Sequence, residues 1–392
     1  MTGKHPARLD LTNWIGGEQS GLLTQAPYIR ELPLDEVTVG EAFREHGYAT
    51  GYVGKWHLGA EQYLPDDQGF DFTFAVNHAG QPGSYFPPYE NPNFEVTNVP
   101  DLDGDPDGAY LTDRLTDVSL DFLERNRDRP FFLVLSHYAV HTPLQAEAAA
   151  VARYEAKAAA LGPESDEDYT TEREASTKLR QDHATYAAMI ESTDESVGRI
   201  MEGLAELGID DRTVVVFVSD NGGLSTLMRR SFNQATANAP LRAGKGWLYE
   251  GGIRAPLIMT GPNVAAGATI DRPTSSTDLY PTLLDLADLP LLPQQHQDGV
   301  SLAPLTRGEA ATGRGPLFWH FPHYHGSGNR PGAAIRDGDM KLVEWFEDGA
   351  VELYDLSADI GERDDLASER PEEAARLLAE LNRWREEVGA NM

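Results

Sequence analysis

The sequence of 392 residues contains no cysteine. This absence excludes disulfide bonds, a thiolate zinc site and a cysteine nucleophile within these residues. Long apolar runs are also absent, because the longest, such as 131–135 and 214–218, are strand-sized, whereas a membrane helix needs about 20 residues. Residues 1–8 lack the apolar stretch of a signal peptide. We therefore expect no membrane span, and the cellular compartment stays unknown.

Basic residues are few relative to acidic ones. Lys and Arg total 32 and Asp and Glu total 63, which gives a formal net charge of −31. So negative a surface repels nucleic acids and anionic membranes, and we expect neither as a partner. We interpret the charge as a solubility feature. An anionic substrate must then be bound by a local basic pocket that opposes the field of the whole chain.

The first 310 residues alternate strand-like apolar runs with helical patterns. This alternation predicts an α/β fold in which a mostly parallel mixed sheet is flanked by helices. A polar stretch rich in Pro and Gly, 65–108, predicts a long surface excursion. We expect strands at 49–53, 130–136, 213–219 and 256–260, and helices at 37–46, 110–126, 147–162, 178–207 and 278–286.

Beyond residue 310 the pattern changes to short strand-like segments. Asp337-Gly338 supplies a hairpin turn between two of them. We therefore predict two domains, residues 1–310 and a small C-terminal antiparallel α+β subdomain over 311–392. The expected strands of the second domain are 317–321, 333–336, 341–346 and 351–354, and its helix is 371–388.

The segment 47–59 reads Gly-Tyr-Ala-Thr-Gly-Tyr-Val-Gly-Lys-Trp-His-Leu-Gly. Side chains two apart in an extended chain share a face, so Lys55 and His57 project together. A cation beside an imidazole can hold an anionic ester and donate hydrogen bonds to its oxygens. An arbitrary Lys-x-His is more often an exposed lysine beside a structural histidine, so this segment alone does not establish a site.

Polar side chains follow two other apolar runs. Asp220 and Asn221 come after 214–218, where ligands bind in open α/β sheets, and their oxygens suit calcium or magnesium rather than zinc. An Asp-Asn-Gly turn is the alternative interpretation. His137 and His141 come after 131–135, and each can donate a proton or contact an anion.

Lys245 lies in a glycine-rich segment, 240–256. The glycines allow the backbone to approach a ligand closely and to position the ammonium group. The segment does not match the spacing of a Walker phosphate-binding loop.

Together, these four segments resemble the sulfatase family of the alkaline-phosphatase-like superfamily. The pattern at 47–59 is similar to the family's second signature, and the pattern Leu-Arg-x-Gly-Lys-Gly-x-x-Tyr-Glu-Gly-Gly-Ile-Arg-x-Pro at 241–256 is nearly as diagnostic. The resemblance extends from residue 1 to about residue 366. It implies a hydrolase of aryl or carbohydrate sulfate esters, in a family whose members are usually exported.

The resemblance also implies roles for individual residues. His141 is expected to protonate the departing alcohol, and His137 is left as structural. Calcium is the implied metal, with Asp220 and Asn221 as ligands. Four residues are expected to contact the sulfate, the nucleophile or the leaving oxygen, namely Lys55, His57, His141 and Lys245.

Substrate contacts are also expected in the C-terminal part of the chain, which borders the pocket in this family. The segment 318–325, Phe-Trp-His-Phe-Pro-His-Tyr-His, combines aromatic and imidazole groups that suit a sugar sulfate. We predict His323 and Arg242 as substrate-binding residues. The alternative is that the aromatic side chains of this segment belong to the core.

Two features of the family are missing from the sequence. The family nucleophile is formylglycine, made from the first residue of Cys-x-Pro-x-Arg or Ser-x-Pro-x-Arg, and no such segment occurs here. The aspartate pair that ends the family's first strand is also missing, and Asp66-Asp67 imitates it without a preceding apolar strand. Residues 1–8 resemble the stretch just after the nucleophile. We therefore expect an N-terminally truncated chain that lacks a central strand and is inactive as given.

Three interpretations stay open. The first is a sulfate-ester hydrolase by descent, acting on aryl sulfates, sulfated monosaccharides or polysaccharides. The second is a phosphoester or phosphonate hydrolase of the same superfamily, which would need other metal ligands. The third is a non-catalytic protein that binds anions or sugar sulfates.

Overall fold

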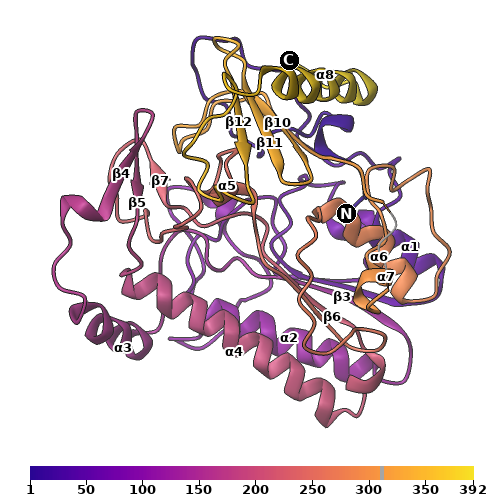
Figure 1. The fold of residues 1–392 in the computed structure, drawn as a ribbon. Helices are drawn as coiled ribbons and strands as arrows, with labels where there is room; N and C mark the ends of the chain where they lie inside the picture. The colour runs from indigo at the N-terminus through magenta and orange to yellow at the C-terminus, as the bar shows by residue number, and fades with distance from the viewer. Residues whose placement is uncertain (310–312) are drawn as a thin grey trace.

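The computed structural model describes residues 1–309 and 313–392. In its larger part, two long helices, α2 (Leu111–Asn126) and α4 (Ala184–Glu206), run side by side below the strands (Figure 1). The hydroxyls of Thr116 and Ser196 join the two helices by a hydrogen bond of 2.6 Å. The predicted domain boundary between residues 310 and 311 falls outside the described residues.

A parallel three-stranded sheet packs on these helices. Its central strand, β1 (Ala49–Gly54), pairs with β2 (Phe72–Phe74) on one side and with β3 (Phe131–Ser136) on the other. The helix α1 (Val39–Glu45) leads into β1, and a capping box formed by Thr38 and Glu41 begins it. These elements confirm the predicted strands and helices of this region, and α2 is the crossover that parallel strands require.

The next strand, β6 (Val215–Val218), pairs only with β8 (Leu257–Thr260), and the pair is antiparallel. Phe131 at the start of β3 and Val215 at the start of β6 pack into one apolar cluster with Leu123 of α2. Both strands therefore lie on the same helical layer. They share no ladder of hydrogen bonds within the described residues.

The facing edges of β3 and β6 leave their apolar side chains partly exposed. Every residue of β3 is only half-buried, Val218 of β6 is 44% exposed and Ile258 of β8 is 60% exposed. Strands of this apolar composition are normally covered on both faces and paired at both edges. The predicted sheet is thus present as two separate ladders.

An antiparallel arm projects from this part of the molecule (Figure 1). It consists of β4 (Tyr169–Glu172), β5 (Ala175–Lys178) and β7 (Thr226–Leu227). The sequence patterns did not predict the arm, and they started the following helix too early, at residue 178. The helix begins at Ala184 because the side chain of His183 accepts the N–H of Tyr186 as an N-cap.

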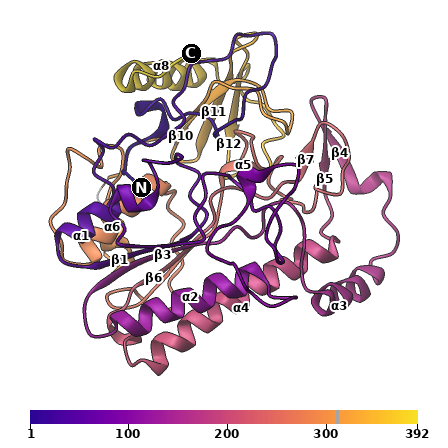
Figure 2. The same ribbon diagram turned by 180° about the vertical axis from the view of Figure 1, so that it is seen from behind.

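The C-terminal part is the predicted small antiparallel sheet with a terminal helix (Figure 2). The strands pair in the order β12-β11-β10-β9, and the turn at Gly338 has a φ of +62°. Helix α8 covers one face of the sheet, while the other face packs on Trp247 and Tyr249 of the glycine-rich segment. The bounds are β9 (Leu317–Phe321), β10 (Gly332–Asp337), β11 (Met340–Trp345), β12 (Val351–Asp355) and α8 (Pro371–Val388).

The remaining helices are short or peripheral. They are α3 (Ala148–Ala159), α5 (Glu250–Ile253), α6 (Leu279–Leu286) and α7 (Ala303–Thr306), with 3-10 turns at Pro6–Arg8, Pro65–Gln68, Glu95–Thr97, Asp166–Asp168, Asp210–Arg212 and Ser276–Asp278. Among residues 1–309 and 313–392, no helix combines the length and the apolarity needed to cross a bilayer.

A buried charge network joins the C-terminal sheet to α5. The Lys341 ammonium on β11 lies 2.7 Å from a carboxylate oxygen of Glu362 and 3.1 Å from one of Glu250. Glu362 also accepts the backbone N–H of Glu250, at 2.6 Å. Because α5 lies near the end of the glycine-rich segment, this network fixes the position of that end.

Candidate active site

The carboxyl ends of β1, β3 and β6 bring the predicted site residues together. Lys55 follows β1, and its N–H donates to the carbonyl of Ser136 at the end of β3, at 2.8 Å. Gly54 makes this approach possible, since a Cβ at that position would lie 2.1 Å from the same carbonyl oxygen. Asp220, which follows β6, acts electrostatically on Lys55.

The glycine-rich segment delivers Lys245 to the same place. Its N–H donates to the carbonyl of Gly223, at 3.1 Å, two residues after Asn221. Close backbone packing makes this contact possible, because a Cβ at Gly222 would lie 1.8 Å from the carbonyl oxygen of Gly251. The loop after β6 and the glycine-rich segment are therefore held in one fixed arrangement.

Burial and mutual repulsion destabilise the charges of the two lysines. Burial lowers the pKa of Lys245, Asp220 opposes this effect, and Lys55 adds to it. Burial lowers the pKa of Lys55 as well, again against Asp220. Two ammonium groups near one carboxylate leave an excess of positive charge, although the chain as a whole carries −31. This local excess of positive charge is what an anionic ligand needs in so acidic a chain.

Two predicted histidines face the same lysines. Burial, followed by Lys55, lowers the pKa of His57 to about 4. Burial, followed by Lys245 and Lys55, lowers the pKa of His141 to about 3. Both imidazoles are therefore neutral at neutral pH. The His57 ring lies against Gly80, where a Cβ would come within 2.5 Å of it.

The position of His141 is fixed through its backbone. Its N–H donates to the carbonyl of Tyr138 and its carbonyl accepts the hydroxyl of Tyr85, both at 2.9 Å. Its Nδ1 lies 3.2 Å from the carbonyl of Thr142, which leaves Nε2 for a ligand. His137, by contrast, bonds to Ser196 of α4 at 2.9 Å, in keeping with the structural role expected for it.

The metal ligands expected from the resemblance are Asp220 and Asn221. Asp220 is exposed, and the Asn221 amide donates to the carbonyl of Gly222 at 2.9 Å, so its side-chain oxygen is free to bind a cation. Their donor type suits calcium, but calcium takes six to eight oxygens. In the part of the chain that the structure describes, no three side chains of His, Cys, Asp or Glu gather as a metal site. Asp220 and Asn221 thus offer the type of oxygen that calcium binds, but fewer oxygens than calcium takes.

Asp66 and Asp67 do not complete this set. They lie exposed in the 3-10 turn Pro65–Gln68. That turn packs against the start of α1, where the Thr38 hydroxyl donates to the carbonyl of Gln68 at 2.6 Å. This location agrees with the sequence interpretation that the pair only imitates the family motif.

The two predicted substrate contacts are engaged within the fold. His323 is fully buried, and its ring nitrogens lie 2.8 Å from the Thr12 hydroxyl and 2.6 Å from the Gln25 amide. Arg242 forms a two-pronged ion pair with Glu172 and stacks on the ring of Tyr249 at 3.8 Å. Both side chains are thus engaged by other groups of the protein, and their role as substrate contacts stays a prediction.

A different histidine of the same segment faces the lysines. The His325 ring covers Gly246, where a Cβ would lie 2.2 Å from its Nδ1. Burial, followed by Lys245, lowers its pKa to about 4, and Nδ1 lies 2.8 Å from the hydroxyl of Ser327. The sequence contained the signal, three histidines in eight residues, but only the packing distinguishes the one beside Lys245.

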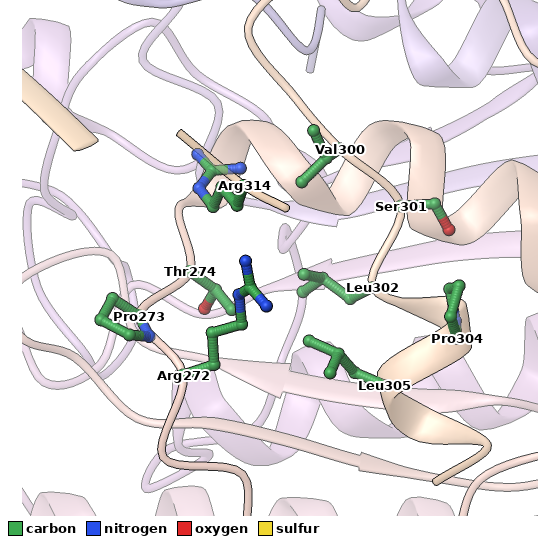
Figure 3. Close-up of a pocket in the computed structure, with 9 residues that line it drawn as sticks. All are labelled: Arg272, Pro273, Thr274, Val300, Ser301, Leu302, Pro304, Leu305 and Arg314. Carbon is green, nitrogen blue, oxygen red and sulfur yellow. The ribbon is translucent and has the colours of Figure 1, made fainter. Parts of the chain in front are cut away.

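A small pocket elsewhere in the molecule is separate from this site. It is lined by Arg272, Arg314 and apolar residues around α7, and Figure 3 shows both guanidinium groups beside Thr274. Arg314 is paired with Asp278. None of the predicted site residues lines this pocket.

Comparison with known proteins agrees with the fold and the motifs. The sulfatase family model matches residues 5–289, and the model of the N-sulphoglucosamine sulphohydrolase C-terminal region matches residues 243–387. A sulfatase from Formosa agariphila is 32% identical over 91% of this chain and 69% of its own length. Human arylsulfatase A is 29% identical over 92% of this chain and 71% of its own length. The chain thus spans about two thirds of these relatives.

Solved structures give the same result. The crystal structure of Ps i-CgsB in complex with k-i-k-neocarrahexaose superposes with a TM-score of 0.76 at 27% identity, covering 98% of this chain and 80% of that one. The match of both family models, the related sequences and the shared architecture lead to one conclusion. The chain belongs to the sulfatase family of sulfate-ester hydrolases and has the alkaline-phosphatase-like α/β fold of that family.

Proposed function

We propose that Lys55, His57, His141 and Lys245 form the pocket that binds the sulfate group of the substrate. The observation that carries the proposal is their convergence at the carboxyl ends of β1 and β3, where each lysine perturbs both histidines. Two half-buried ammonium groups close to one another repel, and a bound anion relieves that repulsion. A sulfate ester is such an anion.

Where a nucleophile is supplied, the leaving alcohol would be protonated by His141, with Lys245 sharing its oxygen. The free imidazole is neutral because burial and the two lysines lower its pKa to about 3. A bound anion offsets the two ammonium charges and so raises this pKa toward the range in which His141 can carry a proton. His141 therefore becomes able to act as an acid only when the anionic substrate is bound.

Calcium is the proposed metal, held by Asp220 and Asn221 together with ligands that these residues alone do not supply. When bound, it would stabilise negative charge on the sulfate oxygens. Lys55, His57, His141 and Lys245 bind and orient the ester without it.

These 392 residues are proposed to bind the ester without turning it over. They contain no cysteine and no Ser-x-Pro-x-Arg segment, hence no precursor of the family nucleophile. A non-catalytic sugar-sulfate-binding protein is accordingly the second candidate function. A phosphoester or phosphonate hydrolase is the weaker alternative because it needs metal ligands beyond Asp220 and Asn221.

A carbohydrate sulfate is the proposed substrate class. The Ps i-CgsB structure, at 27% identity, holds a neocarrahexaose, and one matched family model describes an N-sulphoglucosamine sulphohydrolase. Aryl sulfates are the alternative, named for the relative arylsulfatase A. His325, beside Lys245, is the C-terminal histidine we propose as a substrate contact in place of His323.

Binding and turnover of 4-nitrophenyl sulfate with added calcium test the proposal. Lys245→Ala should weaken binding at least tenfold, about 1.4 kcal/mol. Lys157→Ala on the exposed face of α3 removes the same charge and should change binding less than twofold. Absence of binding in a folded sample would refute the pocket. Turnover that Lys245→Ala abolishes would refute the expected inactivity and would require an unrecognised nucleophile.

A further inference from the structure

An irregular loop, residues 10–27, borders the cationic pocket. Thr12 of this loop lies 2.8 Å from His323, two residues before His325, whose ring covers Gly246 beside Lys245. The backbone of Ile15 opposes the lowering of the His57 pKa, so this part of the loop lies near the proposed sulfate site. A turn closes here, with the N–H of Gly17 donating to the carbonyl of Trp14 at 2.9 Å. Trp14 is therefore the immediate neighbour of a residue that lies near the pocket.

Trp14 is unusual among the tryptophans of this chain. Of the six, it alone appears among the exposed large apolar side chains, at 46% exposure. The backbone of Gly17 lies against its indole, since a Cβ there would come within 2.5 Å of Nε1 and 2.6 Å of Cε2. The chain thus covers part of the ring and leaves the rest exposed, where a ligand that covers it would gain hydrophobic free energy.

The loop is held in place although it has no regular secondary structure. His323 bonds to Thr12 at 2.8 Å on one side of the turn and to Gln25 at 2.6 Å on the other. The Tyr324 hydroxyl accepts the N–H of Leu23 at 3.0 Å. These contacts position the indole before any ligand arrives and reduce the entropy that binding would otherwise cost.

We propose that Trp14 is a stacking platform for a sugar ring of a sulfated saccharide whose sulfate occupies the pocket at His57. This inference rests on the proposed function and adds its substrate class and a specificity residue. An exposed indole fits the apolar face of a sugar ring and leaves the hydroxylated edge of that ring in water. A steroid or large aryl group would need enclosure on several sides.

Binding measured by calorimetry tests the platform without relying on turnover. The probes are a carrageenan-derived sulfated hexasaccharide and 4-nitrophenyl sulfate, at an ionic strength of about 0.15 M so that the acidic surface is screened. The unchanged chain should bind the hexasaccharide more tightly. Trp14→Ala should weaken binding of the hexasaccharide about tenfold and binding of the aryl sulfate less than twofold.

Matched variants separate stacking from general apolar contact. Trp14→Phe should retain most of the affinity for the hexasaccharide, whereas Trp14→Leu should behave like Trp14→Ala. The platform would be overturned if Trp14→Ala weakened the affinity for both probes equally or for neither. It would also be overturned if the unchanged chain bound the hexasaccharide no better than the aryl sulfate. Failure of the proposed function looks different, because then Lys245→Ala would leave the affinity for both probes unchanged.

Discussion

Removal of the buried Lys341 ammonium should destabilise the chain far more than removal of an exposed lysine. The Lys341 side chain is 0% exposed, as is that of Glu362, and the Glu250 side chain is 2% exposed. Lys341→Met fills the same space without charge and leaves Glu362 without this cation in the interior, while Glu250 keeps its ion pairs with Arg254 and Arg336. Breaking a buried pair in this way costs about 3–5 kcal/mol. The control Lys157→Met should stay within about 0.5 kcal/mol.

The penalty should depend on pH with a defined sign. Burial raises the pKa of Glu362 above its ordinary value even though Lys341 opposes this effect. Loss of Lys341 raises it further, so the folded variant binds a proton that the unfolded chain does not. The destabilisation is therefore largest at neutral pH and shrinks as the pH falls toward the folded pKa of Glu362.

Urea unfolding of three variants measures this effect. The double variant Lys341→Met/Glu362→Gln also removes the stranded carboxylate of Glu362 and should recover at least half of the lost free energy of unfolding. Because Glu362 also holds the first residue of α5, binding of the sulfate probe at Lys245 should weaken in the single variant. The argument is refuted if Lys341→Met resembles Lys157→Met, or if the double variant is no more stable than the single one.

Two further perturbations follow from the site. Burial lowers the pKa of His137 to about 4, so the unfolded chain binds more protons between about pH 4 and 6.5, and stability falls as the pH drops through that window. The free energy of unfolding should therefore fall less between pH 7 and pH 4.5 in His137→Gln, by about 2 kcal/mol. Urea titrations at the two pH values measure this loss, and an equal loss in the variant and the unchanged chain would contradict the prediction. Gly222→Ala would place a Cβ 1.8 Å from the carbonyl of Gly251 and should lower the thermal midpoint and sulfate affinity together. Gly198→Ala, in open space on α4, should instead stabilise by about 0.5–1 kcal/mol, and equal effects of the two alanines would argue against the packing of the loop.

Local patterns were sufficient for most elements. The strands β1 and β3 and the helices α2 and α8 lie within a residue or two of their expected bounds, because hydrophobic periodicity and caps are encoded in neighbouring residues. The arm of β4, β5 and β7 escaped prediction. Its strands are two to four residues long, and β5 is paired with β7, which lies about fifty residues later in the chain.

The sequence by itself determined the family and the identity of the cationic residues. Lys55, His57 and Lys245 stand in patterns whose order and spacing are specific enough to be recognised without coordinates. The rule that ligands bind beyond strand ends also singled out His141 and Asp220, each directly after an apolar strand. These inferences were possible because each depends on residues that are neighbours in the chain.

Only the tertiary structure decided what the C-terminal histidines contact. His323 and His325 are two residues apart, yet the first is enclosed by the loop of residues 10–27 and the second covers Gly246 beside Lys245. Nor did the sequence reveal that Arg242 is bound by Glu172. The physical reason is the same in both cases, because the surroundings of a side chain are set by segments up to about three hundred residues away in sequence, which only folding brings into contact.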